Sequence, residues 1–265
     1  EKPLTETKKL PVPQNGEICL NHVSFQYEAG VKALDDVSLT IRPGTVTALV
    51  GESGGGKSTV ANLIARFWDV SEGSVTVGGV DVRELDYADW MKHISIVFQD
   101  TNLFKMSVAE NVAMYKPGAS REEIMEVLRQ AQCEDILEKL PNGVDSVIGA
   151  RGVYLSGGEM QRIALARAIL KDAPIVLLDE ATAFADAENE YLIQRALDIL
   201  LHGKTVLMIA HRLQTIVHAD QIIVMQRGGI DEQGTHEDLM QRQGVYAKMY
   251  HEYENSISWK IGGWA

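Results

Sequence analysis

Residues 51–58 read GESGGGKS, which matches the phosphate-loop pattern G-x-x-x-x-G-K-[ST]. The apolar stretch Thr45–Val50 predicts a buried strand before it, and the spacing of apolar residues over Lys57–Trp68 predicts a helix after it. Glycines in such a loop let backbone N–H groups surround a phosphate, and the helix start adds the positive end of its dipole. A plain glycine-rich turn is the competing interpretation, which the flanking strand and helix disfavour. The residues expected to bind the nucleotide here are Gly51, Glu52, Ser53, Gly54, Gly55, Gly56, Lys57, Ser58 and Thr59.

An acidic pair follows a second apolar strand, Ile175–Leu178. A buried strand of an α/β sheet delivers its C-terminal residues to the ligand crevice. We therefore expect Asp179 to hold Mg²⁺ together with the Ser58 hydroxyl, and Glu180 to polarise an attacking water as general base. A solvated strand end is the alternative, and it is the weaker one because a phosphate loop precedes the pair in the same chain.

Composition restricts the class of protein. The 265 residues include 37 acidic and 25 basic side chains, for a formal net charge of −12, which argues against a nucleic-acid partner. The two cysteines, Cys19 and Cys133, lack metal-ligand spacing and are expected to be reduced thiols. No apolar run approaches the roughly 18–20 residues that a membrane helix needs.

The chain changes character along its length. Residues 1–16 carry three prolines and three lysines, which predicts a linker. Because the chain opens with Glu1, we expect it to be part of a longer protein. Residues 107–140 are rich in charged residues and helix formers, which predicts a run of helices. From Ser156 onward predicted helices alternate with apolar strands, which is typical of a parallel sheet covered on both faces.

Shorter elements complete the prediction. Alternating apolar and polar residues predict half-buried strands, and more apolar runs predict buried ones. The former are at Ile18–Tyr27, Val37–Ile41 and Ser74–Val77, and the latter at Ile94–Phe98, Thr205–Ile209 and Gln221–Met225. Residues Glu237–Glu254 are expected to be helical, and residues 256–265 have no clear pattern.

A second glycine-containing motif stands at residues 155–159, which read LSGGE and are followed by Gln161-Arg162. Ser156 is a good helix N-cap, and two glycines at a helix start expose backbone N–H groups, which makes a second anion site. An ordinary capped helix is the competing interpretation. The string closely resembles LSGGQ, the signature motif of ABC ATPases. The residues that carry this resemblance are Leu155, Ser156, Gly157, Gly158 and Glu159.

Three further residues match the motifs of that family in its order. Tyr27, in VSFQY, matches the aromatic residue that stacks on adenine, although an exposed strand aromatic is the alternative. Gln99, after the strand Ile94–Phe98, matches the Q-loop glutamine, which contacts Mg²⁺ and senses the membrane domain. His211, in IAHRL, matches the switch histidine that contacts the γ-phosphate. The resemblance thus implies that Glu180, His211 and Gln99 are catalytic and that Ser58, Gln99 and Asp179 bind the metal.

Two segments depart from the family pattern. The D-loop usually reads SALD, whereas here residues 183–186 read AFAD, which keeps Asp186 but replaces the serine expected to make cross-dimer contacts. The segment before the signature usually contains GERG, whereas residues 149–152 read GARG. The string ATAFAD-x-ENE is similar to that of exporter-type transporters that import iron-siderophores.

The resemblance covers about residues 17–250 and implies an α/β fold. Its parts are a P-loop NTPase (RecA-like) core with a parallel sheet, an N-terminal antiparallel β subdomain, and an inserted α-helical subdomain at about residues 100–158. The nucleotide-binding domain would span residues 17–255, between the linker at 1–16 and a C-terminal tail at 256–265.

The same resemblance implies the motor domain of an exporter-type ABC transporter, which binds ATP and Mg²⁺ and hydrolyses the ATP. Its expected partners are a second nucleotide-binding domain, from the same or a homologous chain, and a transmembrane domain that precedes it in the full-length chain. Its expected place is the cytoplasmic face of the cell membrane, the bacterial inner membrane in particular.

The alternatives are a soluble ABC ATPase acting on nucleic acid or ribosomes, which the acidic balance disfavours, and a regulatory module without turnover. The set of Lys57, Asp179, Glu180 and His211 argues against the latter.

Overall fold

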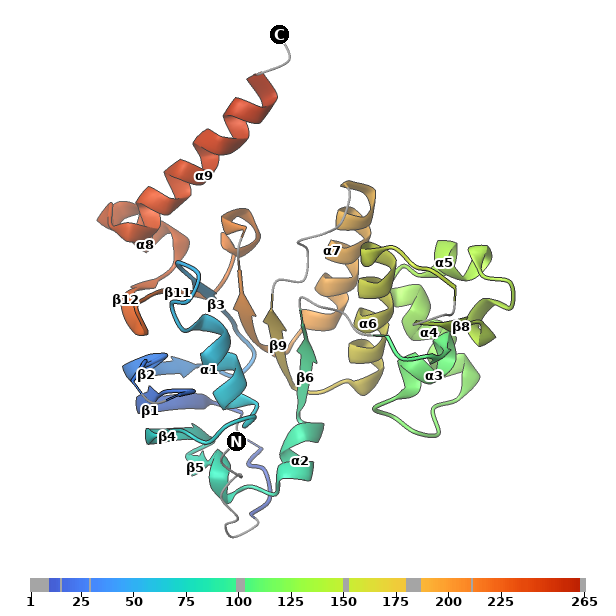
Figure 1. Cartoon of the computed structure of the whole chain (residues 1–265), viewed down its shortest axis with the longest axis horizontal. Coiled ribbons are helices and arrows are strands. Elements are labelled where there is room, and N and C mark those ends of the chain that lie inside the picture. The colour runs from blue at the N-terminus through green and yellow to red at the C-terminus, as the bar shows by residue number, and fades with distance from the viewer. Residues whose placement is uncertain are drawn as a thin grey trace. The chain divides into compact units, whose positions relative to one another are not determined.

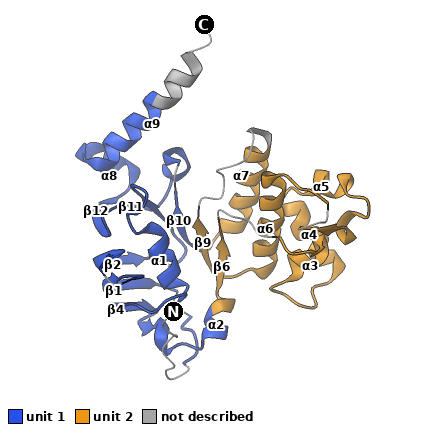
Figure 2. Ribbon diagram, in the orientation of Figure 1, with its two compact units in different colours: residues 1–90, 205–265 blue, residues 91–204 orange. Residues whose placement is uncertain are grey.

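The computed structural model divides the chain into two compact units (Figure 2). Unit 1 holds residues 1–90 and 205–265, and unit 2 holds residues 91–204, so the chain leaves unit 1 once and returns to it. The structure describes residues 10–14, 16–28, 30–98, 103–149, 153–179, 187–210 and 212–262. Within these ranges, residues 187–188 and 256–262 are described by their backbone alone.

Unit 1 contains an antiparallel sheet whose strands lie in the order β2-β1-β4-β5 (Figure 1). Their bounds are Ile18–Phe25 (β1), Leu34–Ile41 (β2), Glu72–Val77 (β4) and Val80–Asp81 (β5). Apolar side chains on one face of these strands are fully buried, Ile18, Val37 and Val77 among them. The alternation of apolar and polar residues in β2 thus corresponds to one buried and one exposed face, as predicted.

The remaining strands of unit 1 lie in the order β12-β11-β3-β10. Their bounds are Val46–Val50 (β3), Thr205–Ile209 (β10), Gln221–Gln226 (β11) and Gly229–Gly234 (β12). β3 pairs in parallel with both β10 and β11, while β12 returns antiparallel to β11 after a tight turn. β3 therefore lies inside the sheet, and helix α1 (Lys57–Ile64) follows the loop at its carboxyl end.

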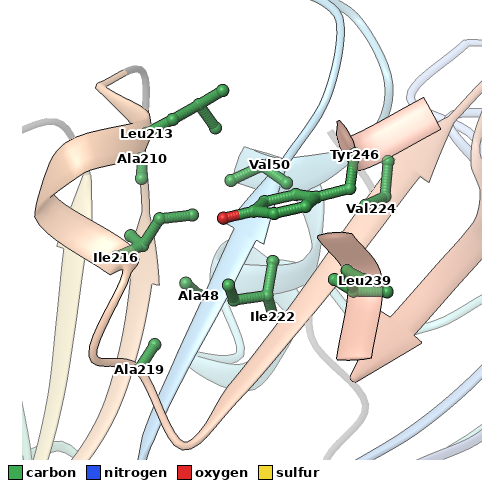
Figure 3. Close-up of a cluster of buried hydrophobic side chains, with 10 residues drawn as sticks. All are labelled: Ala48, Val50, Ala210, Leu213, Ile216, Ala219, Ile222, Val224, Leu239 and Tyr246. Carbon is green, nitrogen blue, oxygen red and sulfur yellow. The ribbon is translucent and has the colours of Figure 1, made fainter. Parts of the chain in front are cut away.

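A buried cluster joins this sheet to the C-terminal helices α8 (His236–Arg242) and α9 (Val245–Gly262). The ring of Tyr246 lies among apolar side chains of β3 and β11 and beside Leu239 of α8 (Figure 3). Tyr246 is completely buried, and its hydroxyl is hydrogen-bonded to Nδ1 of His236 at 2.8 Å. Burial raises the pKa of Tyr246 to about 12, so the phenol stays neutral in this core.

Unit 2 combines a pair of parallel strands, β6 (Ile94–Val97) and β9 (Ile175–Asp179), with helices. The long helix α6 (Gly157–Lys171) packs against helices α3, α4 and α7 and against β6. Ile163, Leu165 and Ala166 are fully buried and mark the inner face of α6. The other helices are α3 (Val108–Ala113), α4 (Arg121–Gln130), α5 (Glu134–Lys139) and α7 (Ala187–Leu201).

Short elements connect these parts. The turns η1 (Val82–Glu84) and η2 (Gly143–Asp145) and the strand pair β7 (Met106–Ser107) and β8 (Val147–Ile148) are each two or three residues long. Helix α2 (Tyr87–Lys92) runs across the boundary of the units, and η3 (Leu213–Ile216) precedes β11. None of the helices in the described part of the chain has the length and apolar character required to cross a membrane.

The predicted fold class is confirmed: a core with parallel strands, an N-terminal antiparallel sheet and a helical region are all present. The helical stretch predicted at Glu237–Glu254 is present, but it is divided in two, because Gln243 adopts φ +52° and ends α8 before α9 begins. The residues after 255, which showed no pattern, continue α9 to Gly262. Leu10, within the predicted linker, forms a β-bridge with Leu85 of unit 1.

Candidate functional site

The loop Gly51–Gly56 connects β3 to α1, as the sequence predicts. Gly51, Gly54 and Gly56 have φ values of +129°, +79° and +99°. L-residues rarely adopt these conformations, so glycine is required for the path of the backbone. The loop can therefore turn back over the start of α1, which is the arrangement that surrounds a phosphate with backbone N–H groups.

Neighbouring backbone also demands glycine in this loop. A Cβ on Gly51 would lie 2.0 Å from the carbonyl oxygen of Met225 in β11, and one on Gly56 would lie 2.7 Å from the carbonyl oxygen of Ala33. Gly54 has no such neighbour within 4 Å. The loop is thus held between β11 and the segment before β2, and this cradle is too narrow for side chains at Gly51 and Gly56.

Lys57 lies under the loop and is 5% exposed. Its Nζ donates hydrogen bonds to the carbonyl oxygens of Gly51 at 2.8 Å and Glu52 at 2.7 Å. Helix α1 has no side-chain N-cap and no acidic residue in its first turn. An ammonium and an uncompensated helix start therefore converge on one loop, which favours an anionic ligand.

The other loop residues differ in exposure. Glu52, Ser53, Gly54 and Ser58 are exposed, while Thr59 is buried. Ser58, in the first turn of α1, is thus accessible, and its hydroxyl is a hard oxygen ligand of the kind that a cation such as Mg²⁺ prefers. In the predicted nucleotide-binding stretch, residues 55–57 and Thr59 are therefore buried, while residues 52–54 and Ser58 are accessible to a ligand.

Tyr27 lies next to this helix. Its hydroxyl donates to Oγ1 of Thr59 at 3.2 Å and accepts from Nδ2 of Asn62 at 3.3 Å. The ring is 48% exposed and meets the ring of Trp68 edge to face, with centroids 5.2 Å apart. The ring of Phe25 also meets Tyr27 edge to face, with centroids 4.9 Å apart. These contacts fix the orientation of an exposed aromatic face, which suits stacking on a nucleotide base.

Trp68 was not among the predicted site residues. In the sequence, Trp68 is the aromatic residue that ends the stretch Lys57–Trp68. The apolar spacing of that stretch indicates a helix and gives no sign of a binding site. The structure instead ends α1 at Ile64 and leaves Trp68 36% exposed beside Tyr27.

Unit 2 holds two other predicted sites. Asp179 is the last residue of β9, whose preceding residues Ile175–Leu178 are all buried. It thus lies at the carboxyl end of a parallel strand, as predicted. The predicted residues Gln99, Glu180, Asp186 and His211 lie outside the described residues.

The LSGGE segment begins helix α6. Ser156 is its N-cap: Oγ accepts from the backbone N–H of Glu159 at 3.3 Å, and the Glu159 carboxylate accepts from the backbone N–H of Ser156 at 2.8 Å. Leu155 is buried and anchors the approach to the helix. This reciprocal capping box fixes the first turn of α6.

The two glycines of this segment have different surroundings. Gly157 is exposed and Gly158 is buried. A Cβ on Gly158 would lie 2.8 Å from Cβ and Cγ of Asn189 in α7. Gly158 is thus needed for the close packing of α6 on α7, while Gly157 leaves backbone accessible at the helix start.

Comparison with known proteins identifies relatives of this chain. Residues 34–183 match the family model described as ABC transporter. The mycobactin import ATP-binding/permease protein IrtA of Mycolicibacterium thermoresistibile is 52% identical over 235 residues, which are 89% of this chain and 26% of the relative. The ATP-dependent lipid A-core flippase of Legionella pneumophila (strain Lens) is 47% identical over 235 residues, 89% of this chain and 40% of the relative.

A solved structure agrees with these relatives. It is that of a bacterial Atm1-family ABC exporter with ATP bound, with a TM-score of 0.86 and 36% sequence identity. The match covers 93% of this chain and 44% of the exporter. The chain therefore spans less than half the length of each of these three proteins.

Proposed function

Because this chain belongs to the ABC transporter family, we propose that it is the motor domain of a longer transporter that moves a solute across a membrane. The chain is an ATP-binding domain of this family, and ATP hydrolysis is its enzymatic activity. The observation that carries the proposal is the phosphate loop, in which Lys57 and the start of α1 converge. The comparisons lend no support to the nucleic-acid alternative.

The phosphates of ATP are the anions that this loop fits. Glycine-only positions at Gly51 and Gly56 leave room for the phosphates against the backbone, and Lys57 would compensate their charge. The exposed hydroxyl of Ser58 and the carboxylate of Asp179 are oxygen donors of the kind Mg²⁺ prefers, and Gln99 is a third candidate from the sequence. Bound Mg²⁺ would neutralise charge on the phosphates. Tyr27, with Trp68 beside it, would stack on the adenine.

The chemistry of hydrolysis is assigned to residues that the sequence motifs single out. Glu180 would polarise the attacking water as general base, and His211 would contact the γ-phosphate. Catalysis would then consist mainly of positioning and charge compensation.

We propose a head-to-tail dimer of two such domains. The start of α6 is a second anion site in the same chain, because Ser156 caps the helix and Gly157 is exposed. In the proposed dimer this helix start contacts the γ-phosphate of the ATP that the other domain holds. Asp186 would take part in the same interface. Two ATP molecules would close the dimer, and hydrolysis would open it.

The dimer would work at the cytoplasmic face of a membrane. Its closing and opening would move transmembrane domains that precede residue 1 in the full-length chain. The lengths of the relatives support this, since their names describe whole transporters and this chain matches only part of each. The name of the mycobactin import protein agrees with the siderophore hypothesis. The lipid A-core flippase is nearly as similar, so identity in this domain does not select the cargo.

The test is the variant Glu180→Gln. It should still bind ATP and form an ATP-dependent dimer, because the amide keeps the shape of the side chain, but it should release phosphate at least about 100-fold more slowly than the unaltered chain. Mass in solution with and without Mg-ATP reports the dimer, and phosphate release reports turnover. Normal turnover would exclude Glu180 as general base. Absence of turnover in the unaltered chain would support a regulatory module instead.

A further inference from the structure

The signature segment carries a carboxylate where the common motif has an amide. Glu159 occupies the third position of α6, one helical turn from Ser156. An anion in the first turn compensates the positive end of the helix dipole, and the proposed γ-phosphate contact requires that same positive end. A bare carboxylate there would therefore repel the nucleotide that the helix start is proposed to bind.

A lysine from another helix compensates this carboxylate. Nζ of Lys139, the last residue of α5, donates to Oε1 of Glu159 at 3.2 Å, while Oε2 accepts from the backbone N–H of Ser156. The side chain of Glu159 is 14% exposed, and that of Lys139 is 66% exposed. Burial alone would raise the pKa of Glu159, but hydrogen bonds from Ser156 and Lys139 together lower it, so the group is ionised.

The position of Lys139 is set by a second ion pair between the same two helices. Asp135, one turn before Lys139 in α5, accepts from Nη1 and Nη2 of Arg162 at 2.6 and 3.0 Å and lies 3.7 Å from Lys139. Arg162, one turn after Glu159 in α6, is 1% exposed. Two residues of α5 thus hold two residues of α6, which keeps the ammonium of Lys139 at the first turn.

We propose that Lys139 is a positioning residue for ATP: by compensating Glu159, it keeps the start of α6 attractive to the γ-phosphate held by the partner domain. This inference rests on the proposed function of the signature segment. A unit charge acting over about one helical turn changes an equilibrium constant by about 4- to 10-fold when the dielectric constant is about 80 to 45, as it is for charges largely exposed to water. Loss of Lys139 should weaken ATP-dependent closure by that factor, and salt should reduce the effect.

The chain contains a matched control for a purely structural role. In α4, Ser120 and Glu123 form the same capping box, and Lys116 donates to Oε1 of Glu123 at 2.7 Å. That helix starts without the glycine pair of the signature, and no site motif is assigned to it. If a lysine on such a glutamate serves only to stabilise a helix, the two lysines should behave alike on substitution.

The experiment compares Lys139→Gln, Lys116→Gln and the double variant Lys139→Gln/Glu159→Gln in the 265-residue chain, with ATP as the probe. KM and kcat for ATP hydrolysis are measured at low and high salt, and thermal unfolding is followed in parallel. We expect Lys139→Gln to raise KM about 4- to 10-fold at low salt with a smaller change in kcat, and less at high salt. The double variant should return KM to near its original value, because a glutamine can complete the capping box without a charge. Lys116→Gln should leave KM unchanged.

Equal KM values for Lys139→Gln and Lys116→Gln would overturn the inference, as would a double variant without recovery. Lys139→Gln could also lower thermal stability and raise KM in parallel. If the double variant reverses neither change, Lys139 has a structural role, and the inference is overturned. If the unaltered chain does not hydrolyse ATP, the proposed function itself fails and the inference falls with it. If the unaltered chain hydrolyses ATP but Lys139→Gln leaves KM unchanged, the inference about Lys139 is refuted and the proposed function stands.

Discussion

Alanine at Gly51 should destabilise the protein far more than alanine at Gly54, although both residues belong to the same loop. Both have positive φ, +129° and +79°, so either alanine pays a conformational penalty of roughly 1–2 kcal/mol. Only Gly51 has a close neighbour: its added Cβ would lie 2.0 Å from the carbonyl oxygen of Met225, whereas Gly54 faces open space. The pair separates the effect of backbone conformation from that of close approach.

The size of the difference follows from what must move. Ordinary Cβ contacts start at 3.4 Å, so the carbonyl of Met225 would have to shift by about 1.4 Å, the difference between 3.4 and 2.0 Å. Met225 is completely buried in β11, which pairs with β3 next to the loop. Such a shift disturbs core packing, which costs about 1–3 kcal/mol of stability. It also breaks one or two hydrogen bonds between strands, each of which contributes about 1 kcal/mol. We expect Gly51→Ala to lose about 3–7 kcal/mol of unfolding free energy and Gly54→Ala about 1–2 kcal/mol.

Urea-induced unfolding of the two variants and the unaltered chain measures both losses, with circular dichroism and tryptophan fluorescence as independent probes. Coincident transitions and an unchanged slope against urea are needed to compare the midpoints as stabilities. If the two variants fall within about 0.5 kcal/mol of each other, the close approach of β11 is not what requires glycine at position 51.

Two further changes probe the site and the charge network. Lys57→Ala should weaken ATP binding about 10- to 100-fold, because it removes the buried ammonium that is proposed to face the phosphates. An unchanged Kd in calorimetry would contradict that role. Acid should weaken the contact between α5 and α6: the hydrogen bond from Arg162 lowers the pKa of Asp135 against the opposing effect of burial. A lowered pKa in the folded state means that the stabilisation is complete above the unfolded value of about 3.9 and is lost as pH falls through the folded value. Asp135→Asn should therefore flatten the fall in stability below about pH 5, and an unaltered pH profile in urea unfolding would show that the pair contributes nothing.

Much of the molecule could be predicted from the sequence because its information is local. The glycine-lysine-serine string at Gly51–Ser58 specifies a loop between a strand and a helix by backbone conformation alone. The apolar run Ile175–Leu178 predicts a buried strand, which the structure confirms and which places Asp179 at its carboxyl end. Ser156 with Glu159 three residues later is a capping box, and the helix starts where that pattern predicts.

Other features could not be predicted because they depend on how segments of the chain pack. The apolar spacing of Glu237–Glu254 fits one helix, yet Gln243 adopts a left-handed conformation between α8 and α9, and Tyr246 of α9 packs on the sheet. Trp68 ends the stretch Lys57–Trp68 that the apolar spacing predicts to be helical, yet α1 ends at Ile64, and only the fold leaves Trp68 exposed at the edge of Tyr27.

Local residue patterns are enough to indicate where a phosphate can bind, since glycines, a lysine and a capped helix start carry that chemistry wherever they occur. The tertiary structure decided which of those glycines is indispensable and which charges act together. Gly51 is constrained by Met225, 174 positions along the chain, and Glu159 is compensated by Lys139 from a different helix. Such constraints arise from distances between segments, and no local pattern of residues encodes a distance.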